Sequence, residues 1–289
     1  MLNRPASILV PCCLAATWLV WGSTYLVIKF ALVSFAPYVL SGMRYLTAGT
    51  ALLVFARWRG SPWPSWRQTR NAALIGFLML TVGNGLTCVA EKTLPSGATA
   101  LIVAVTPLMA VVINHFLGTR STLIEAVGIV CGMVGIGIMN FDSSLAGDPR
   151  AAGLMGIACL SWALASAIIR RIALPEGAMS SAVQMIAGGL ISLPLALIIG
   201  ERFPASPTWG SVAALAYLSV FGSIIAYSAF VWLLRNVRPA LATSSSYVNP
   251  VVALLLGTVF LNEAVTWPLV AGITIILVGM VLISRGGRG

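Results

Sequence analysis

Residues 179–199 read MSSAVQMIAGGLISLPLALII, a run of 21 residues without a charged side chain. A helix needs about 20 residues to cross the hydrocarbon core of a bilayer, so the run has the required length. Apolar residues occur all round such a helix, which leaves no polar face for water. Glu176 precedes the run and Glu201 follows it. The stretch therefore predicts a transmembrane helix.

The composition of the whole chain extends this prediction. Of its 289 residues, 59% are apolar and 8% are charged, against a charged share of roughly 25% in soluble domains. A water-soluble fold of this size could not cover its surface with so few charges. The chain is therefore interpreted as an all-α membrane protein, a single transmembrane domain over residues 1–289. Ten spans would use about 200 residues, which leaves no room for a separate soluble domain.

Runs like the first one, bounded by proline, glycine or charge, predict ten transmembrane helices. They cover residues 8–28, 37–56, 71–90, 95–118, 122–140, 151–169, 179–199, 208–232, 239–260 and 267–284. Pro37, Pro95, Pro239 and Pro268 lie at helix starts, where the missing backbone N–H of proline is not needed. Their positions support these boundaries.

The basic residues predict the orientation, because lysine and arginine concentrate in cytoplasmic loops. With a cytoplasmic N-terminus, twelve basic residues lie inside and four outside, and both termini are cytoplasmic. The net charge of +10 thus belongs to loops at a membrane surface, so we expect no nucleic acid partner. Residues 1–23 have the composition of a signal peptide, but the internal repeat described next gives the first helix a partner and argues against cleavage.

The second half of the chain repeats the first at a nearly constant offset. Trp21 aligns with Trp162 at 141 residues, Pro107 with Pro250 at 143, and Gly128 with Gly272 at 144. Because each unit holds five helices, the second enters the membrane from the opposite side. These are inverted-topology five-helix repeats, 8–140 and 151–284, as in many secondary transporters, whose substrate site lies near the midplane between the halves. The alternative is a chance echo of hydropathy.

Several short segments resemble a known family. They are Trp21-Gly22-Ser23-Thr24, Arg44-Tyr45-Leu46, Ser96-Gly97-Ala98-Thr99-Ala100 leading to Thr106-Pro107-Leu108, and Asn249-Pro250-Val251 followed by Leu261-Asn262-Glu263. With them the chain resembles the EamA-type transporters of the drug/metabolite transporter superfamily. Where that pattern usually has glycine, this chain has Asn262, a departure that we expect to affect a loop turn.

The resemblance implies a metabolite exporter in a bacterial inner membrane. In such a protein, helices 1, 3, 4, 6, 8 and 9 surround a central cavity, and helices 5 and 10 are peripheral. Length and layout resemble the YddG-type exporters of aromatic and other neutral amino acids. The motifs are shared across the superfamily, however, and do not fix a substrate.

Polar residues inside the spans are the candidate substrate contacts. In helix 9, Ser246 and Asn249 share a face, and Pro250 frees a backbone carbonyl near Ser246. Thr106 and Pro107 form the equivalent break in helix 4, and such breaks are where transporters expose backbone to a ligand. The alternative reading is that small hydroxylated residues serve close helix packing.

A second group of candidates lies in helices 1, 3, 6 and 8. Trp21 and Trp162 lie near the centres of helices 1 and 6, away from the interfaces where tryptophan usually collects. Their rings could stack on an apolar or aromatic substrate, or serve only the core. Asn84 of helix 3 aligns with Tyr227 of helix 8 at the 143-residue offset.

Other unusual residues favour structural roles. Arg44 is charged inside helix 2, and its cost there marks a functional candidate. It can also snorkel outward, and helix 2 is peripheral in the resembling family, so we favour a structural role. His115 is interpreted as an interface residue. The glycines of helices 5 and 10 predict packing or dimer surfaces, which leaves a homodimer open. The five cysteines show neither metal-site nor disulfide spacing.

The residues that are missing narrow the function. No acidic residue lies deep in a span, although Glu91 and Glu125 lie at span ends, which disfavours cationic substrates and proton coupling through a deep carboxylate. No basic residue lies centrally in helices 3, 4, 8 or 9, which disfavours a phosphate clamp. One histidine and no deep aspartate disfavour an intramembrane enzyme, and neither a metal nor a cofactor is expected.

The sequence therefore predicts export of neutral or zwitterionic metabolites, above all aromatic and neutral amino acids, by facilitation or exchange. Uncharged drug-like or purine-type metabolites are the alternative substrates, because the same apolar cavity would accept them. A membrane receptor or scaffold is the alternative class.

Overall fold

The computed structural model describes residues 4–94, 102–103, 105–118, 122–139, 148–249, 251–252 and 267–286. Within these ranges all regular structure is helical, and six helices are long and apolar enough to cross a membrane. They are Ile8–Leu32, Pro37–Trp58, Trp66–Ala90, Pro149–Ile168, Gly177–Ile198 and Trp209–Asn236. Two shorter apolar stretches, Leu123–Gly135 and Val270–Gly279, accompany them. The chain is thus an all-α protein with several membrane spans.

Eight of the predicted ranges coincide with observed helices to within about five residues at each end. The other two, 95–118 and 239–260, lie partly outside the described residues, as does Pro95. Three long helices each contain a π-helical segment, in which the backbone bonds skip one residue more than in an α-helix. They are α1 (Arg4–Ala15), η1 (Ala16–Val20) and α2 (Trp21–Leu32); α4 (Trp66–Gly76), η2 (Phe77–Asn84) and α5 (Gly85–Ala90); and α11 (Trp209–Tyr217), η3 (Leu218–Tyr227) and α12 (Ser228–Asn236). The others are α3 (Pro37–Trp58), α7 (Thr106–Phe116), α8 (Leu123–Met139), α9 (Pro149–Ile168), α10 (Gly177–Ile198), α13 (Pro239–Ala242) and α15 (Trp267–Gly286).

Two of the π-helical segments, η2 in the first half and η3 in the second, lie at equivalent positions. Shifted by the 143-residue repeat offset, η2 coincides with residues 220–227, which fall within η3. Hydropathy does not distinguish π-helical from α-helical backbone, so this agreement is independent of the pattern that first indicated the repeat. Single-turn π insertions occur frequently at functional sites.

Helix starts are fixed by local capping. The Ser65 hydroxyl accepts from the Gln68 backbone N–H while the Gln68 side chain accepts from the Ser65 N–H, a reciprocal capping box that begins α4. The start of α3 is capped from elsewhere in the chain, because Glu201 Oε2 accepts from the backbone N–H groups of Tyr38 at 2.9 Å and Val39 at 3.0 Å. A carboxylate there also complements the positive end of the helix dipole.

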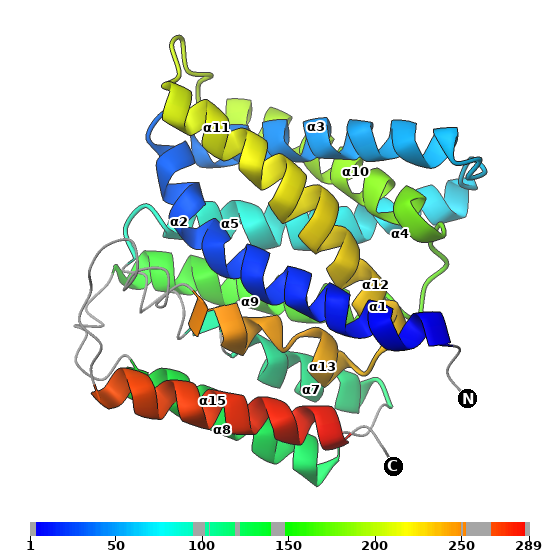
Figure 1. The fold of residues 1–289 in the computed structure, drawn as a ribbon. Helices are drawn as coiled ribbons and strands as arrows, with labels where there is room; N and C mark the ends of the chain where they lie inside the picture. The colour runs from blue at the N-terminus through cyan, green and yellow to red at the C-terminus, as the bar shows by residue number, and fades with distance from the viewer. Residues whose placement is uncertain are drawn as a thin grey trace.

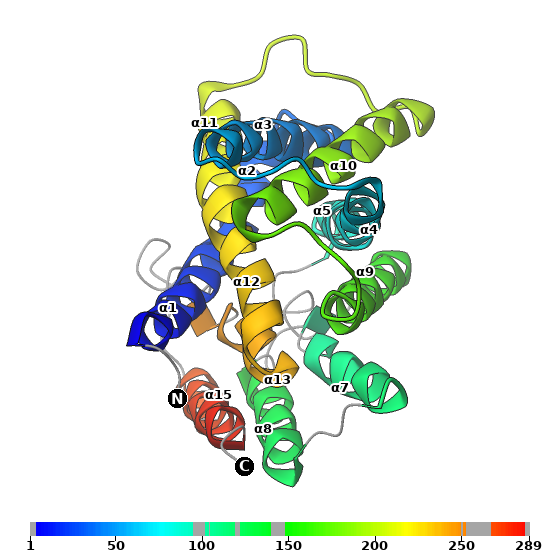
Figure 2. The same ribbon diagram turned by 90° about the vertical axis from the view of Figure 1, so that its right-hand side faces the viewer.

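The helices form a bundle with one peripheral pair (Figures 1 and 2). The pair is α8 and α15, the predicted helices 5 and 10. It lies on the side of the bundle opposite to α3 and α10. A Cβ added at Gly135 would meet the Gly272 carbonyl oxygen at 2.7 Å, and one at Gly279 would meet the Gly128 carbonyl oxygen at 2.6 Å. The glycine faces of helices 5 and 10 therefore pack on each other, as small-residue interfaces in membranes do.

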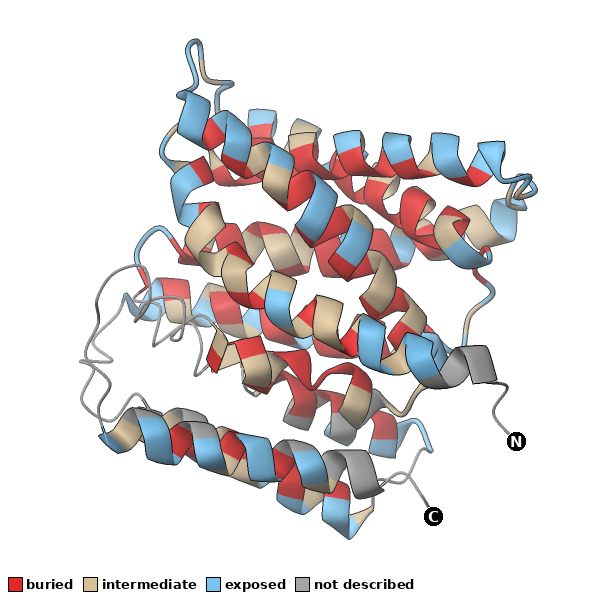
Figure 3. Ribbon diagram, in the orientation of Figure 1, coloured by how far each residue is buried: buried red, intermediate tan, exposed pale blue. Residues whose placement is uncertain are grey.

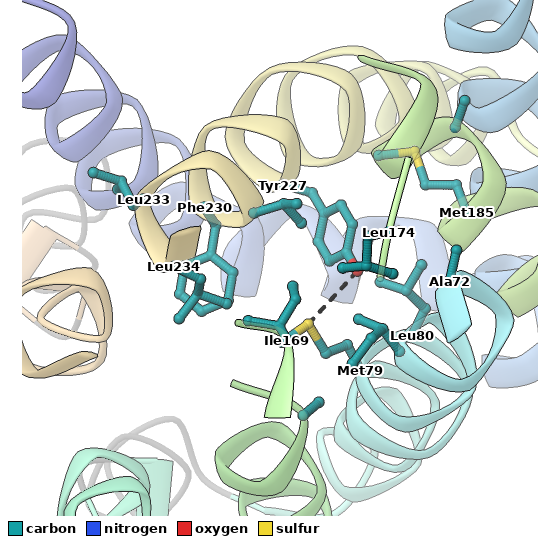
Figure 4. Close-up of a cluster of buried hydrophobic side chains, with 14 of the residues drawn as sticks. Ala72, Met79, Leu80, Ile169, Leu174, Met185, Tyr227, Phe230, Leu233 and Leu234 are labelled. Carbon is teal, nitrogen blue, oxygen red and sulfur yellow. Dashed lines mark hydrogen bonds between the residues drawn. The ribbon is translucent and has the colours of Figure 1, made fainter. Parts of the chain in front are cut away.

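Burial separates the outside of the bundle from its centre (Figure 3). Exposed side chains on the outer helices include large apolar ones such as Val130, Leu190, Phe221 and Leu277. An apolar surface of this extent fits contact with lipid. Inside, Met79, Leu80, Met185 and Tyr227 belong to one buried cluster, in which the Tyr227 hydroxyl reaches the Met79 sulfur at 3.6 Å (Figure 4).

The loops gather at two ends of the bundle. At one end, Arg170 donates to the Val237 carbonyl at 3.0 Å and Arg235 donates to the Pro175 carbonyl at 3.0 Å. The start of α1 and the end of α15 lie on this same side (Figure 1). The segments joined at the opposite end are 30–39 and 201–211, through Glu201 and through Ser211, which donates to the Phe30 carbonyl at 2.8 Å. The arginine-rich loops thus share one end.

We expect that end to be cytoplasmic, and labelling of introduced cysteines tests this. In a background without the five native cysteines, a probe next to Arg67 should react only with reagent on the cytoplasmic side, and a probe next to Asp148 only with reagent outside. The physical reason is the resistance of arginine-rich loops to translocation. If both probes were labelled from one side, the inverted-repeat topology would be wrong.

Candidate functional site

One cavity lies in the centre of the bundle, between the two halves of the chain. Its water-accessible volume is about 100 Å³. A single water needs roughly 10–15 Å³ by this kind of measure, so the space holds several waters, or a small metabolite in their place. The described residues that line it come from α2, α3, η2, α5, α7, α9, η3 and α12, together with residues 103, 243, 245, 246 and 249.

All seven candidate substrate contacts predicted from the sequence line this cavity. They are Trp21, Asn84, Thr106, Trp162, Tyr227, Ser246 and Asn249. The structure brings them together from six of the predicted spans. That they contact substrate remains a prediction.

Four aromatic side chains form one wall of the cavity. The ring centroids of Trp21 and Trp162 lie 5.6 Å apart in an edge-to-face arrangement, and Phe230 packs against both, at 4.9 and 5.4 Å. Tyr227 lies 6.4 Å from Trp162, with its hydroxyl turned away to donate to Gln184 Oε1 at 2.7 Å. Tyr227 therefore offers its ring, not its hydroxyl, to the cavity. The sequence prediction omitted Phe230.

The two tryptophans differ in their polar atoms. The Trp21 indole N–H donates to the Gly222 carbonyl in η3 at 3.0 Å. For Trp162, no hydrogen bond of the indole N–H is found to any described residue, and the ring lies against Gly83, where an added Cβ would come within 2.3 Å of Nε1. The Trp21 ring is therefore held by η3, whereas the Trp162 ring is held by packing against Gly83 of η2.

The predicted helix breaks concern helices 4 and 9. Helix α7 begins at Thr106, with Pro107 in its first turn. Residue 104 lies outside the described residues, so a break in helix 4 at Pro107 stays a prediction. In helix 9, α13 ends at Ala242, and residues 243–244 form a turn before helix resumes at 245. The sequence predicts a break near Ser246, caused by Pro250. The observed turn comes two to three residues earlier, and Pro250 itself lies outside the described residues. Thr243, Ser245 and Ser246 line the cavity at this turn.

Two buried polar atoms at the cavity have no hydrogen-bond partner among the described residues. They are Asn249 Oδ1 and Ser166 Oγ. The Asn249 side chain also interacts with the Tyr25 hydroxyl. An unsatisfied buried acceptor costs about 1–3 kcal/mol, so these atoms are plausible only where a ligand or water meets them.

The structure corrects the interpretation of helix 2. Arg44 was predicted to be peripheral and structural, but it is 3% exposed and lines the cavity together with Tyr45. Helix 2 thus contributes to the cavity alongside the six helices that the resemblance implies. The only sequence signal was the presence of a charge within a span.

Glu91, the first residue after α5, is more buried than its position at a span end suggests. It is 6% exposed, and neither carboxylate oxygen has a hydrogen-bond partner in the part of the chain that the structure describes. Burial raises its pKa to about 8, although Lys29 and Arg44 act in the opposite direction. His115, in contrast, is exposed at the end of α7 and away from the cavity.

Among the described parts of the chain, no cluster of three or more histidine, cysteine or acidic residues could hold a metal ion. The described residues that line the cavity carry aromatic, aliphatic, hydroxyl, amide and thiol groups plus one guanidinium. Several membrane spans around a central cavity, with an interrupted helix beside it, are features of secondary transporters.

Comparisons with known proteins identify the family. The EamA-like transporter family matches residues 9–141 and again 150–285, so the chain belongs to this family, and it is a transporter and not an enzyme. It is 42% identical over 274 residues to the uncharacterized inner membrane transporter YedA of Escherichia coli (strain K12), covering 94% of this chain and 90% of YedA. It is 28% identical over 273 residues to the protein PecM of Dickeya dadantii, covering 92% and 89% of the two chains.

A solved structure shares the fold. It superposes on this chain with a TM-score of 0.80 and 20% sequence identity over 99% of both chains. The family assignment also removes the receptor or scaffold alternative that the sequence left open.

Proposed function

We propose that the protein exports small neutral or zwitterionic metabolites, above all aromatic and other neutral amino acids, across a bacterial inner membrane. The observation that carries this proposal is the aromatic wall of Trp21, Trp162, Tyr227 and Phe230 in a cavity whose other described polar groups are mostly uncharged. Such a wall suits an apolar or aromatic side chain. The relative YedA is named as an inner membrane transporter, which supports the proposed location. The amino acid assignment follows the resemblance to the YddG-type exporters.

In this proposal the chain crosses the membrane ten times, with repeats 8–140 and 151–284 facing each other across the cavity and both termini in the cytoplasm. The breaks beside Thr106 and at residues 243–244 let helices 4 and 9 bend as access alternates between the two sides. Asn84, Thr106, Ser246 and Asn249 offer uncharged donors and acceptors to the ligand.

The energy source follows from the charges around the cavity. None of the described residues that line it is acidic, and Glu91 is sealed at the outer end of its helix. Cation exporters coupled to protons need an accessible carboxylate in the membrane. We therefore propose downhill facilitation or exchange.

The substrate is tested by tolerance and by flux. Cells that overproduce the protein should tolerate toxic analogues of phenylalanine or tryptophan, because export lowers their internal concentration. Proteoliposomes should also carry the radiolabelled amino acid down its gradient, and an imposed proton gradient should not drive accumulation against it.

Protection confined to cationic dyes or phosphorylated metabolites would contradict the amino acid assignment. Preferred transport of an uncharged drug-like or purine-type metabolite would favour the alternative substrate class. Strong proton-driven uphill transport would remove facilitation, and a Glu91→Gln variant would then show whether that carboxylate carries the proton.

A further inference from the structure

The guanidinium of Arg44 is a charged group in the wall of an otherwise uncharged cavity. Its Nε donates to Ser223 Oγ at 2.7 Å, and its Nη2 would lie 2.7 Å from a Cβ added at Gly222. Ser223 and Gly222 both belong to η3, whose Gly222 carbonyl also holds the Trp21 indole. One π-helical segment therefore positions the cation and the aromatic wall together.

The hydrogen-bonding capacity of this guanidinium is largely unused. Arginine carries five N–H donors, and one of them, on Nε, has an acceptor in the described part of the chain. The ring of Tyr45 lies 5.0 Å from Cζ and gives some cation–π stabilisation. A buried guanidinium with so few partners is costly, and in a membrane protein such a group marks a ligand pathway.

No carboxylate of a described residue forms an ion pair with the Arg44 guanidinium. Over the described ranges the ion pair found is that of Arg238 with Glu125, with Nε and Oε1 2.6 Å apart, at the basic end of the bundle. Glu91 acts on Arg44 electrostatically but makes no hydrogen bond to it. Lys29 and Tyr25 of α2 and Cys88 of α5 are the other titratable groups that act on Glu91 or are acted on by it. Among the described residues, the Arg44 guanidinium thus has no carboxylate in ion-pair contact.

We propose that Arg44 binds the carboxylate of the transported substrate through its free Nη donors. A planar guanidinium matches a carboxylate with two parallel hydrogen bonds, and the pairing is strong where water is excluded. The assignment rests on the proposed function, because it names the substrate group that this same cavity recognises.

A carboxylate fits this cavity better than a phosphate does. Arg44 is the one charged residue among the described residues that line the cavity, and a phosphate dianion would need further positive charge. The aromatic wall then receives the rest of the molecule, so the ligand combines one carboxylate with an apolar or aromatic body. The ammonium of an amino acid would face uncharged acceptors such as Asn249 Oδ1.

The test compares two ligands that differ only in the carboxylate group. Binding is measured by thermal shift of the purified protein, and transport by flux. Wild-type protein should bind phenylalanine roughly 10- to 100-fold more tightly than phenylalaninamide, the ratio that charge-assisted hydrogen bonds give. Arg44→Gln should bind both ligands alike, by losing affinity for phenylalanine while keeping that for the amide. Arg44→Lys, which keeps the charge but not the planar fork, should fall between them.

Benzoate and benzamide make the test independent of amino acid transport. If the wild type binds benzoate over benzamide and Arg44→Gln does not, the role of Arg44 holds even where amino acids are not carried. If Arg44→Gln fails to fold, Arg44→Lys and Ser223→Ala, which frees Nε, carry the comparison. Discrimination as strong as that of the wild type in Arg44→Gln, or in Arg44→Lys where Arg44→Gln does not fold, would overturn the proposal. So would absence of discrimination in the wild type and in Ser223→Ala, or tighter binding of phenyl phosphate than of benzoate.

Discussion

Trp162→Ala is expected to lower flux of an aromatic substrate by at least about tenfold while folded protein accumulates normally. Trp162 touches Trp21, Phe230 and Tyr227, so its loss opens the aromatic wall. An aromatic pair contributes about 0.5–1.5 kcal/mol beyond its buried area, and 1.4 kcal/mol is tenfold in affinity. The measurement is initial flux in proteoliposomes, normalised to the amount of monodisperse protein.

Asn249→Ala should lower flux in the same way. It removes an acceptor, Oδ1, that has no partner in the described protein and whose residue lines the cavity. Each change has a matched control elsewhere in the chain. Trp209→Ala removes a tryptophan that is 88% exposed, and Asn114→Ala removes a buried amide that bonds the Ala110 carbonyl within α7. Both controls should leave flux within about twofold of the wild type, because neither residue lines the cavity.

Normal flux in both Trp162→Ala and Asn249→Ala, with the two proteins folded, would remove the proposed site. A comparable loss in the controls would indicate that flux follows general stability and not the cavity. Trp162→Phe refines the result, because it keeps an aromatic ring but deletes the indole N–H that has no hydrogen bond to a described residue.

The cavity was accessible to sequence reasoning because its signals are local. A polar residue in the middle of an apolar run is conspicuous, and the repeat offset singled out Trp21 with Trp162 and Asn84 with Tyr227. All of these line the cavity, since residues that lipid disfavours are placed toward the protein interior.

What the sequence did not reveal depends on contacts between distant segments. Arg44 enters the cavity because α3 packs beside η3, and nothing near residue 44 encodes that neighbour. Phe230 is one apolar residue among many until Trp21 and Trp162 are seen on either side of it. The interruption at residues 243–244 contains no proline that could have revealed it in the sequence. Three serines and a threonine lie there instead, and their hydroxyls can bond to backbone groups that leave the helical pattern.

Gly76→Ala is expected to reduce stability severely, although it adds one methyl group. The new Cβ would lie 2.2 Å from the Gln184 carbonyl oxygen and 2.9 Å from its carbon, and both atoms belong to the backbone of α10. Rotation of a side chain cannot relieve this clash, so α4 and α10 must separate. Overpacking in a well-packed interior costs about 1–3 kcal/mol, and contact with backbone places this change at the upper end.

The same displacement should also reach the cavity. Gln184 is completely buried, donates to Ser180 Oγ at 3.0 Å and accepts from the Tyr227 hydroxyl, so a shift of α10 moves one residue of the aromatic wall. We expect a lower unfolding temperature and a lower monodisperse yield in detergent, with flux reduced in whatever protein remains folded. Unfolding is followed by tryptophan fluorescence on heating.

Gly153→Ala in α9 is the matched control, because a Cβ there meets nothing within 4 Å. Alanine is a better helix former than glycine by roughly 0.5–1 kcal/mol, so this variant should be as stable as the wild type or more stable. The two glycine-to-alanine changes therefore have opposite signs, which general sensitivity of the protein to mutation would not produce. A Gly76→Ala protein as stable as Gly153→Ala would mean that α4 and α10 do not approach as closely as the structure shows.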